Sequence, residues 1–411
     1  MLAITGGEKT KTKPFPPWPY YDHEEEEALR EVLKSRQWWR TPGTKTLEFE
    51  NAFAAYHRGK HGIAVTNGTH ALEVVLSALG IGFGDEVILP DYTFVATGSA
   101  ILSTGAIPVL VDVQEGTYCI DPDQVENSIT IRTKAIIAVH VGGHPVDLDR
   151  LCETAKTHGI PLIEDSAHAH GTEWKNRRVG TFGIAGTFSF QASKLMTAGE
   201  GGIILTNDDA FAQKARSVHD CGRMPGRWFY DHMIYGSNYR LSEWQGAVLG
   251  VQLKRLEAQG TKRFAHARLL DQLLGEIEGI TPQALDERCT HNGHYAYIFH
   301  YDRGAFGGLP RERFIEALKA EGIPEQASYP PLHSLDLFTS GAYQQRLLPE
   351  DRWGEERMTE ILKRAFPVTE KAAYETVWIP HFAFLGDERD IQEIAGAIGK
   401  IRRHASELWS S

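Results

Sequence analysis

Residues 61–94 read HGIAVTNGTHALEVVLSALGIGFGDEVILPDYTF, and the order of apolar runs within them decides the fold. A short β-branched run at 62–66 is followed by a helical pattern over 69–79 and by a second short run at 86–89. Strands that alternate with helices in this way are typical of parallel sheets, in which each helix crosses over to the next strand. The stretch therefore predicts a β-α-β unit of an α/β domain with a mostly parallel central sheet.

The same alternation continues beyond this stretch, and a helix is expected before it. We expect strands at 108–112, 135–139 and 161–164, helices at 94–104, 121–128 and 147–158, and further strands at 186–190 and 202–206 with no long helix between them. On the N-terminal side, Asp22 is placed to cap a helix over 23–35 whose first turn is acidic.

The C-terminal part of the chain predicts a second, smaller unit of α+β type. A long helical region at 240–278 leads into it. We expect strands at 295–301, near 325–329 and at 376–379, with helices at 310–320 and 387–403. The predicted division is an N-terminal arm at 1–22, a large domain at 23–255 and a small domain at 256–411. Polar residues 1–13 are expected to form a loose tail.

Composition excludes several classes of function. The 411 residues include 43 Lys and Arg against 54 Asp and Glu, a net charge of −11, and no basic stretch with interleaved aromatics, so nucleic acid is not an expected partner. Without an apolar run near the ~20 residues of a membrane helix, or a secretory signal at the start, we expect no membrane partner and a cytoplasmic location. We expect reduced thiols, because the four cysteines are far apart in the sequence (Cys119, Cys152, Cys221, Cys289). We expect no metal, because no close pair of histidines has a matching second set of ligands (His140/His144, His168/His170, His291/His294).

Residues suited to ligand binding follow the first two strands, at the carboxyl ends where ligands bind in open α/β sheets. Gly68 and Thr69 open a helix whose first N–H groups can hold a phosphate, although a plain helix cap is the alternative. Phe94 is the first candidate for an aromatic side chain that stacks on a flat ring, and Tyr92 the second. For both aromatics, ordinary core packing is the alternative.

Two later strands end in the residues that a pyridoxal phosphate site requires. Asp165 can pair with the pyridine nitrogen, and His168 can hydrogen-bond the phenolic oxygen of the ring. Near the end of the next strand, Ser189 can donate to the phosphate. In the loop after that strand, Lys194 can hold the cofactor as a Schiff base and then move protons as the freed amine. Taken alone, an aspartate at a strand end is a helix cap as often as it is a catalytic residue. A lysine taken alone is usually a surface residue. The prediction depends on all four strand ends together.

At these positions the chain resembles the DegT/StrS-type sugar aminotransferases of the fold-type I pyridoxal phosphate enzymes, over roughly residues 14–385. The motifs are TNGTHAL (66–72), PDYTF (90–94), EDSAHAHG (164–171), FSFQASK (188–194), GEGG (199–202) and GSNYR (236–240). The resemblance implies an α/β/α large domain, the cofactor roles given above, and a homodimer with a shared active site in which Asn238 reaches the phosphate of the other subunit. It also implies that Arg240 contacts substrate or the interface. Tyr329 and His333 match a segment at the substrate pocket, with a structural loop as the alternative.

Within this family, Gln191 and Glu200 depart from the nucleotide-sugar enzymes. The stretch is similar to glutamine:scyllo-inosose aminotransferases and to 3-amino-5-hydroxybenzoate synthases. We therefore expect transfer of an amino group from L-glutamine or L-glutamate to a keto-cyclitol or keto-sugar in aminocyclitol, aminosugar or antibiotic biosynthesis. The alternatives are a 3-amino-5-hydroxybenzoate synthase-type dehydratase and a nucleotide-sugar aminotransferase. A binding protein without turnover is disfavoured because Lys194 is present. Trp38 and Trp39 are further candidates for the pocket, with core packing as the alternative.

Overall fold

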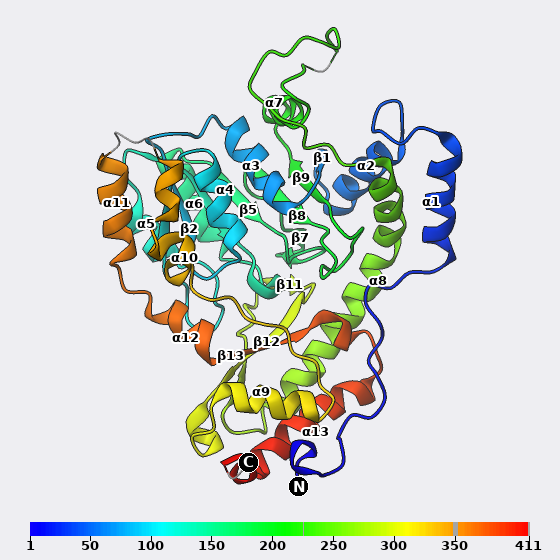
Figure 1. The fold of residues 1–411 in the computed structure, drawn as a ribbon, viewed down its shortest axis with the longest axis vertical. Coiled ribbons are helices and arrows are strands. Elements are labelled where there is room, and N and C mark those ends of the chain that lie inside the picture. Colours follow the sequence, from blue (N-terminus) through cyan, green and yellow to red (C-terminus); the bar gives the residue numbers. More distant parts are fainter. Residues whose placement is uncertain (225, 348–351, 410–411) are drawn as a thin grey trace.

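The computed structural model describes residues 1–224, 226–347 and 352–409. Its centre is a sheet of seven strands in the order β1-β9-β8-β5-β4-β2-β3, in which β9 runs antiparallel to both neighbours and the other pairs are parallel. The predicted α/β fold with a mostly parallel sheet is confirmed (Figure 1). The strands are β1 (His61–Val65), β2 (Glu86–Pro90), β3 (Ile107–Val111), β4 (Thr133–Val139), β5 (Leu162–Asp165), β8 (Ala185–Ser189) and β9 (Gly202–Thr206).

Helices cover this sheet, and most of them follow the predicted ranges. Those predicted are α1 (His23–Ser35), α3 (Gly68–Ala78), α4 (Val95–Ser103), α5 (Pro122–Ser128) and α6 (Leu148–His158). The Asp22 cap is confirmed, since its side chain accepts from the Glu24 N–H and forms a capping box with Glu25. Two further helices, α2 (Lys45–His57) and α7 (Asp209–His219), were not expected. They pack against β1 at the edge of the sheet.

The long helix α8 (Glu243–Leu274) runs from the large sheet toward a smaller antiparallel sheet (Figure 1). That sheet has the order β10-β12-β13, and helices α9 and α13 lie beside it. The elements are β10 (Ile280–Pro282), β12 (Ala296–Tyr301), β13 (Thr376–Pro380), α9 (Arg311–Ala320) and α13 (Glu388–Arg403). A third sheet joins β11 (Cys289–His291) to β6 (Glu173–Trp174) and β7 (Arg177–Arg178).

The predicted strand at 325–329 does not form. Only Gln326 pairs with its neighbour, through a single bridge to Trp378 on β13. Pro324 and Pro330 flank this segment, and a proline has no N–H group to donate to a strand ladder. The segment is therefore irregular, and it lies next to the cavity described below.

Two hydrophobic cores hold the molecule. One surrounds the large sheet, and the other lies between β12, β13, α9 and α13. Side chains of α10 (Asp336–Thr339), α11 (Arg352–Leu362) and α12 (Pro367–Glu375) join the first core, although they follow the small sheet's first strands in the chain. The domain limits at 22 and 255 stay a prediction. In the described part of the chain, no helix is both long and apolar enough to cross a membrane.

The N-terminal tail is not loose, so that expectation is wrong. Leu2 is fully buried in the second core, and its N–H donates to Glu407 at 2.9 Å. Lys11 is also buried, with its Nζ 2.5 Å from Asp390 and 3.0 Å from Glu393 on α13. Polar composition indicated a solvated tail, but these polar groups have specific partners.

Candidate active site

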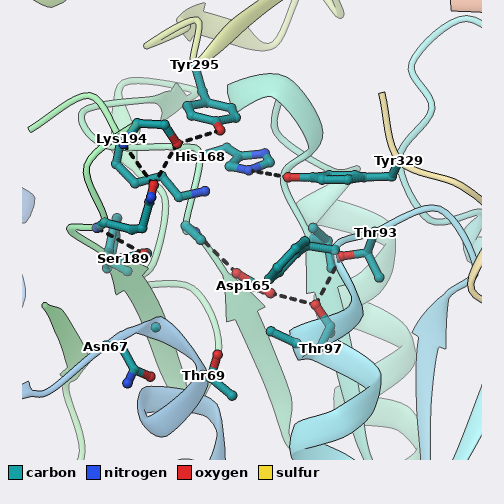
Figure 2. A pocket seen from close by; sticks show the side chains of 18 of the residues that line it. Asn67, Thr69, Thr93, Thr97, Asp165, His168, Ser189, Lys194, Tyr295 and Tyr329 are labelled. Atoms are coloured by element: carbon teal, nitrogen blue, oxygen red, sulfur yellow. Dashed lines mark hydrogen bonds between the residues drawn. The ribbon is translucent and has the colours of Figure 1, made fainter. Parts of the chain in front are cut away.

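A cavity of about 810 Å³ opens at the carboxyl ends of β1, β2, β5 and β8 (Figure 2). β1 runs in the same direction as β8 because each is antiparallel to β9 between them. The loops that follow these four strands therefore meet at one edge of the sheet, as ligand sites in α/β folds do. Eight of the predicted site residues line this cavity: Gly68, Thr69, Phe94, Asp165, His168, Ser189, Lys194 and Tyr329.

Lys194 reaches the cavity from the turn after β8. Its Nζ lies 4.4 Å from the centre of the Tyr295 ring. Burial lowers the pKa of Lys194 to about 8, while the charge of Asp165 opposes that shift. A substantial fraction of this amine is therefore neutral near physiological pH, and a neutral amine is the form that acts as nucleophile or base.

Asp165 ends β5, and it has two hydrogen-bond donors. The Thr97 hydroxyl donates to Oδ2 at 2.9 Å, and the Ala167 N–H donates to Oδ1 at 3.2 Å. Burial raises the pKa of Asp165, and the two donors counteract that shift. The result is an oriented carboxylate at the cavity floor, below His168 in Figure 2. A protonated ring nitrogen is a fitting partner for such a group.

His168 is held on three sides. The Gly142 N–H donates to its Nδ1 at 3.3 Å, and its Nε2 lies 2.9 Å from the Tyr329 hydroxyl. Its ring stacks on Tyr295, with centroids 4.0 Å apart and planes 16° apart. Burial, followed by the charge of Lys194, lowers the pKa of His168 well below its usual value, so the ring is neutral.

The other end of the cavity has the form of an anion site. Asn67 caps α3 by accepting from the His70 N–H at 2.8 Å. Gly68 and Thr69 hold the first two positions of that helix, where N–H groups have no partner inside the helix. A Cβ on Gly68 would lie 2.9 Å from the Ser189 Cβ, so glycine is what lets the helix end approach β8 this closely.

Four predicted site residues do not line the cavity. Tyr92 is fully buried, and its hydroxyl lies 3.3 Å from Thr376 in the core because its ring points to the interior side of the strand end. His333 instead pairs with Asp91, Nδ1 to Oδ2 at 2.6 Å. Arg240 pairs with Asp220 at 2.6 Å, and Asn238 is exposed on the segment before it.

Trp38 and Trp39 also lie away from the cavity. Trp38 packs on Trp244 with ring centroids 5.5 Å apart. The ring of Trp39 makes an edge-to-face contact with Phe229, and its centre lies 5.4 Å from the Arg240 guanidinium. Both indoles are more than a third exposed, so they are neither pocket residues in this chain nor core residues.

Sequence reasoning missed Thr97 and Tyr295. Thr97 lies on α4, three residues after Phe94. Its hydrogen bond to Asp165 at the end of β5 joins two residues that are 68 positions apart in the chain. Tyr295 comes from the loop before β12, far from every motif. A threonine one helical turn after the aromatic was a weak local signal for the first. No local signal points to the second.

The comparisons with known proteins decide the family. A model of the DegT/DnrJ/EryC1/StrS aminotransferase family matches residues 19–399. The chain belongs to this family. It is 39% identical to an L-glutamine:2-deoxy-scyllo-inosose aminotransferase from Streptoalloteichus tenebrarius, over 99% of each chain. The solved 3-amino-5-hydroxybenzoic acid synthase is 38% identical with a TM-score of 0.86, covering 96% of this chain and 100% of that one.

The chain is also similar to a third relative, whose structure was solved with an intermediate bound. The solved DesV of S. venezuelae, in complex with a ketimine intermediate, is 31% identical with a TM-score of 0.80, covering 95% of this chain and 99% of that one. Membership of the DegT/DnrJ/EryC1/StrS family makes this protein an enzyme of the aminotransferase class. The predicted resemblance is confirmed.

Proposed function

We propose that this enzyme binds pyridoxal 5′-phosphate as a Schiff base on Lys194. One observation carries the proposal: a lysine of lowered pKa and a buried, hydrogen-bonded carboxylate lie in one cavity with a helix N-terminus. Asp165 would hold the ring nitrogen, and Gly68, Thr69 and Ser189 the phosphate. Phe94, exposed at the cavity wall, would cover a ring face.

The bound cofactor would supply an electron sink for the bond changes at the substrate carbon. The protein's own part is to place groups around it. Lys194 would take a proton from the donor's α-carbon and pass it to C4′, the cofactor carbon that carries the amino nitrogen, since its amine is neutral in part near pH 8. Ionised Asp165 would keep the ring nitrogen protonated while Thr97 and Ala167 hold that carboxylate in place.

The reaction we propose is transfer of an amino group from L-glutamine or L-glutamate to a keto-cyclitol. The named aminotransferase from S. tenebrarius supports this acceptor class. The cavity lining supports it as well, because it includes Glu200 and Glu325, whose carboxylates can accept hydrogen bonds from the hydroxyl or amino groups of a cyclitol.

A homodimer with a shared site completes the proposal. Asn238 is exposed and lies outside its own chain's cavity, which fits a residue that serves the partner's phosphate. The donor's carboxylate requires a cation, and we assign that part to Arg240 of the second copy. A cytoplasmic location belongs to the same proposal, supported by four free cysteines.

The second candidate is a 3-amino-5-hydroxybenzoate synthase-type dehydratase, favoured by the structural match to that enzyme. Incubation with glutamine and 2-deoxy-scyllo-inosose, and separately with aminodehydroshikimate, separates the two. We expect an aminated cyclitol in the first reaction. Formation of 3-amino-5-hydroxybenzoate in the second, with no aminated cyclitol in the first, would favour the dehydratase instead.

A further inference from the structure

The hydrogen bonds around His168 fix which of its nitrogens carries the proton. A backbone N–H is always a donor, so the Nδ1 that faces Gly142 at 3.3 Å must be the unprotonated acceptor. A neutral imidazole with a bare Nδ1 carries its hydrogen on Nε2. A doubly protonated ring would set two N–H groups against each other at Gly142, and burial already disfavours it.

Among the described residues, the Tyr329 hydroxyl is the hydrogen-bond partner of Nε2. His168 is 5% exposed, and stacking on Tyr295 fixes its plane. Its Nε2 therefore donates to the Tyr329 oxygen, 2.9 Å away (Figure 2). The phenol acts as the acceptor in this bond.

It follows that the Tyr329 hydroxyl does not donate its own hydrogen to His168. Among the described residues, no acceptor lies within hydrogen-bonding distance of the Tyr329 hydroxyl other than this imidazole, which is already the donor. Tyr329 is half-buried and lines the cavity, so its hydroxyl hydrogen is free to be donated to a molecule bound there. A ligand in the cavity is the acceptor that remains.

Contacts of neighbouring residues anchor the segment that carries Tyr329. It lies in the irregular segment after Gln326, and three residues later the Leu332 N–H donates to the Asp91 carbonyl at 2.9 Å. His333 then binds the Asp91 carboxylate through both its N–H at 2.9 Å and its ring at 2.6 Å. The segment that carries Tyr329 is thus held at both ends, by the Gln326 bridge to Trp378 and by the contacts with Asp91.

We propose that the Tyr329 O–H donates a hydrogen bond to the keto oxygen of the amino acceptor, and that Gly142 and His168 are positioning residues that orient it. This rests on the proposed function. Electron density builds on that oxygen when a nitrogen attacks the carbonyl carbon, and a pre-oriented neutral donor stabilises it without having to ionise. In this proposal His168 acts through Tyr329, and its contact with the ring oxygen of a cofactor stays a prediction from the sequence.

The test separates the two half-reactions of the pyridoxal phosphate-loaded enzyme. Glutamine alone converts the cofactor to its amino form, and 2-deoxy-scyllo-inosose then converts it back, so each rate can be followed by absorbance. For Tyr329→Phe we expect the glutamine rate to stay within about 2-fold, and the keto-acceptor rate to fall at least about 10-fold. Tyr118→Phe, a buried tyrosine outside the cavity, should change neither.

A double-mutant cycle tests the positioning role. His168→Asn should slow the acceptor half-reaction in the wild-type background but add little in the Tyr329→Phe background, since the two residues would act as one unit. Additive losses would overturn the role of His168. Equal slowing of both half-reactions in Tyr329→Phe, or no slowing of either, would overturn the role of Tyr329. A wild-type enzyme that reacts with glutamine but with no keto-cyclitol would instead contradict the proposed function, and this inference with it.

Discussion

At Lys194, burial and the nearby carboxylate act on the pKa in opposite directions. Burial disfavours the ammonium form, while Asp165 favours it, and burial is the larger effect. The amine is therefore protonated below about pH 8 and neutral above it. The loop sequence QASK alone could not show this, because the balance depends on how deeply the turn after β8 sits beside β5.

This pKa predicts how the apo-enzyme takes up pyridoxal phosphate. Below about pH 8 the rate of covalent attachment should rise roughly 10-fold per pH unit as the amine loses its proton, and it should level off above that value. The growth of cofactor absorbance in stopped-flow mixing measures it. A rate that keeps rising to pH 10 would show that Lys194 has an ordinary pKa.

Thr97 should control how firmly the cofactor ring is held. Thr97→Val removes the 2.9 Å donor to Asp165 while keeping the shape of the side chain, so this buried carboxylate would be protonated more readily. Hydrogen bonds to charged groups contribute about 1.5–3 kcal/mol, which predicts at least about 10-fold weaker cofactor affinity. Equilibrium dialysis against pyridoxal phosphate measures the change.

The matched control at this position is Thr97→Ser, which keeps the hydroxyl. It should bind the cofactor nearly as tightly as the wild type. If Val and Ser weaken binding equally, the hydroxyl of Thr97 does not act through Asp165.

Among the elements, helix α2 is capped at its N-terminus by a contact that the local sequence does not predict. Its N-terminal Thr44 makes no side-chain cap. Glu243 at the start of α8 supplies the acceptors instead, with carboxylate oxygens 2.7 Å from the Lys45 N–H and 3.0 Å from the Thr46 N–H. A helix capped by a residue 198 positions away lacks the usual start signal, which explains why the sequence did not predict α2.

The stability of the enzyme should depend on this remote cap. Glu243 is 1% exposed, so Glu243→Ala leaves the buried Thr46 N–H and the part-buried Lys45 N–H without their acceptors. We expect the free energy of unfolding to fall by about 2 kcal/mol, measured by urea titration at fixed protein concentration. Glu48→Ala, an exposed glutamate on the same helix, should change it by less than about 1 kcal/mol. Equal effects would argue that Glu243 does not cap α2.

The elements that were predicted share one property. The strands of the large sheet and the helices between them carry their signal in consecutive residues, so periodicity and turn residues sufficed. The failures involve contacts between distant segments. The strand expected at 325–329 lost its ladder to flanking prolines, and the tail at 1–13 is ordered by contacts with distant residues such as Asp390 and Glu407.

The same limit applies to the site. Lys194, Asp165, Ser189 and Gly68 could be predicted because each lies at the carboxyl end of a strand or in the loop after it, and the strand directions gather these ends at one edge. Tyr92 and His333 lie near the same edge, but their side chains face the core and Asp91. Side-chain direction depends on packing from the second half of the chain, which no strand-end rule contains.

At the scale of the whole molecule, the proposed shared site predicts complementation between two inactive variants. Lys194→Ala lacks the Schiff-base lysine, and Asn238→Ala lacks the residue proposed to cross to the partner's phosphate. When the two are unfolded and refolded together, half of the dimers pair one of each and contain one intact site. We expect roughly a quarter of wild-type activity from the mixture.

Two controls make this result specific. Each variant refolded alone should remain inactive or nearly so. A mixture no more active than the two variants refolded separately would contradict a site shared between subunits. Asn238 would then contact the phosphate of its own chain's cofactor or no phosphate at all.

The most direct test of the account concerns Lys194 itself. The purified enzyme, loaded with pyridoxal phosphate, is reduced with borohydride and digested, and its peptides are analysed by mass spectrometry. The account predicts one cofactor-modified peptide, with the modification on Lys194, and none in Lys194→Ala treated in the same way. A modification on another lysine, or its persistence in Lys194→Ala, would contradict it.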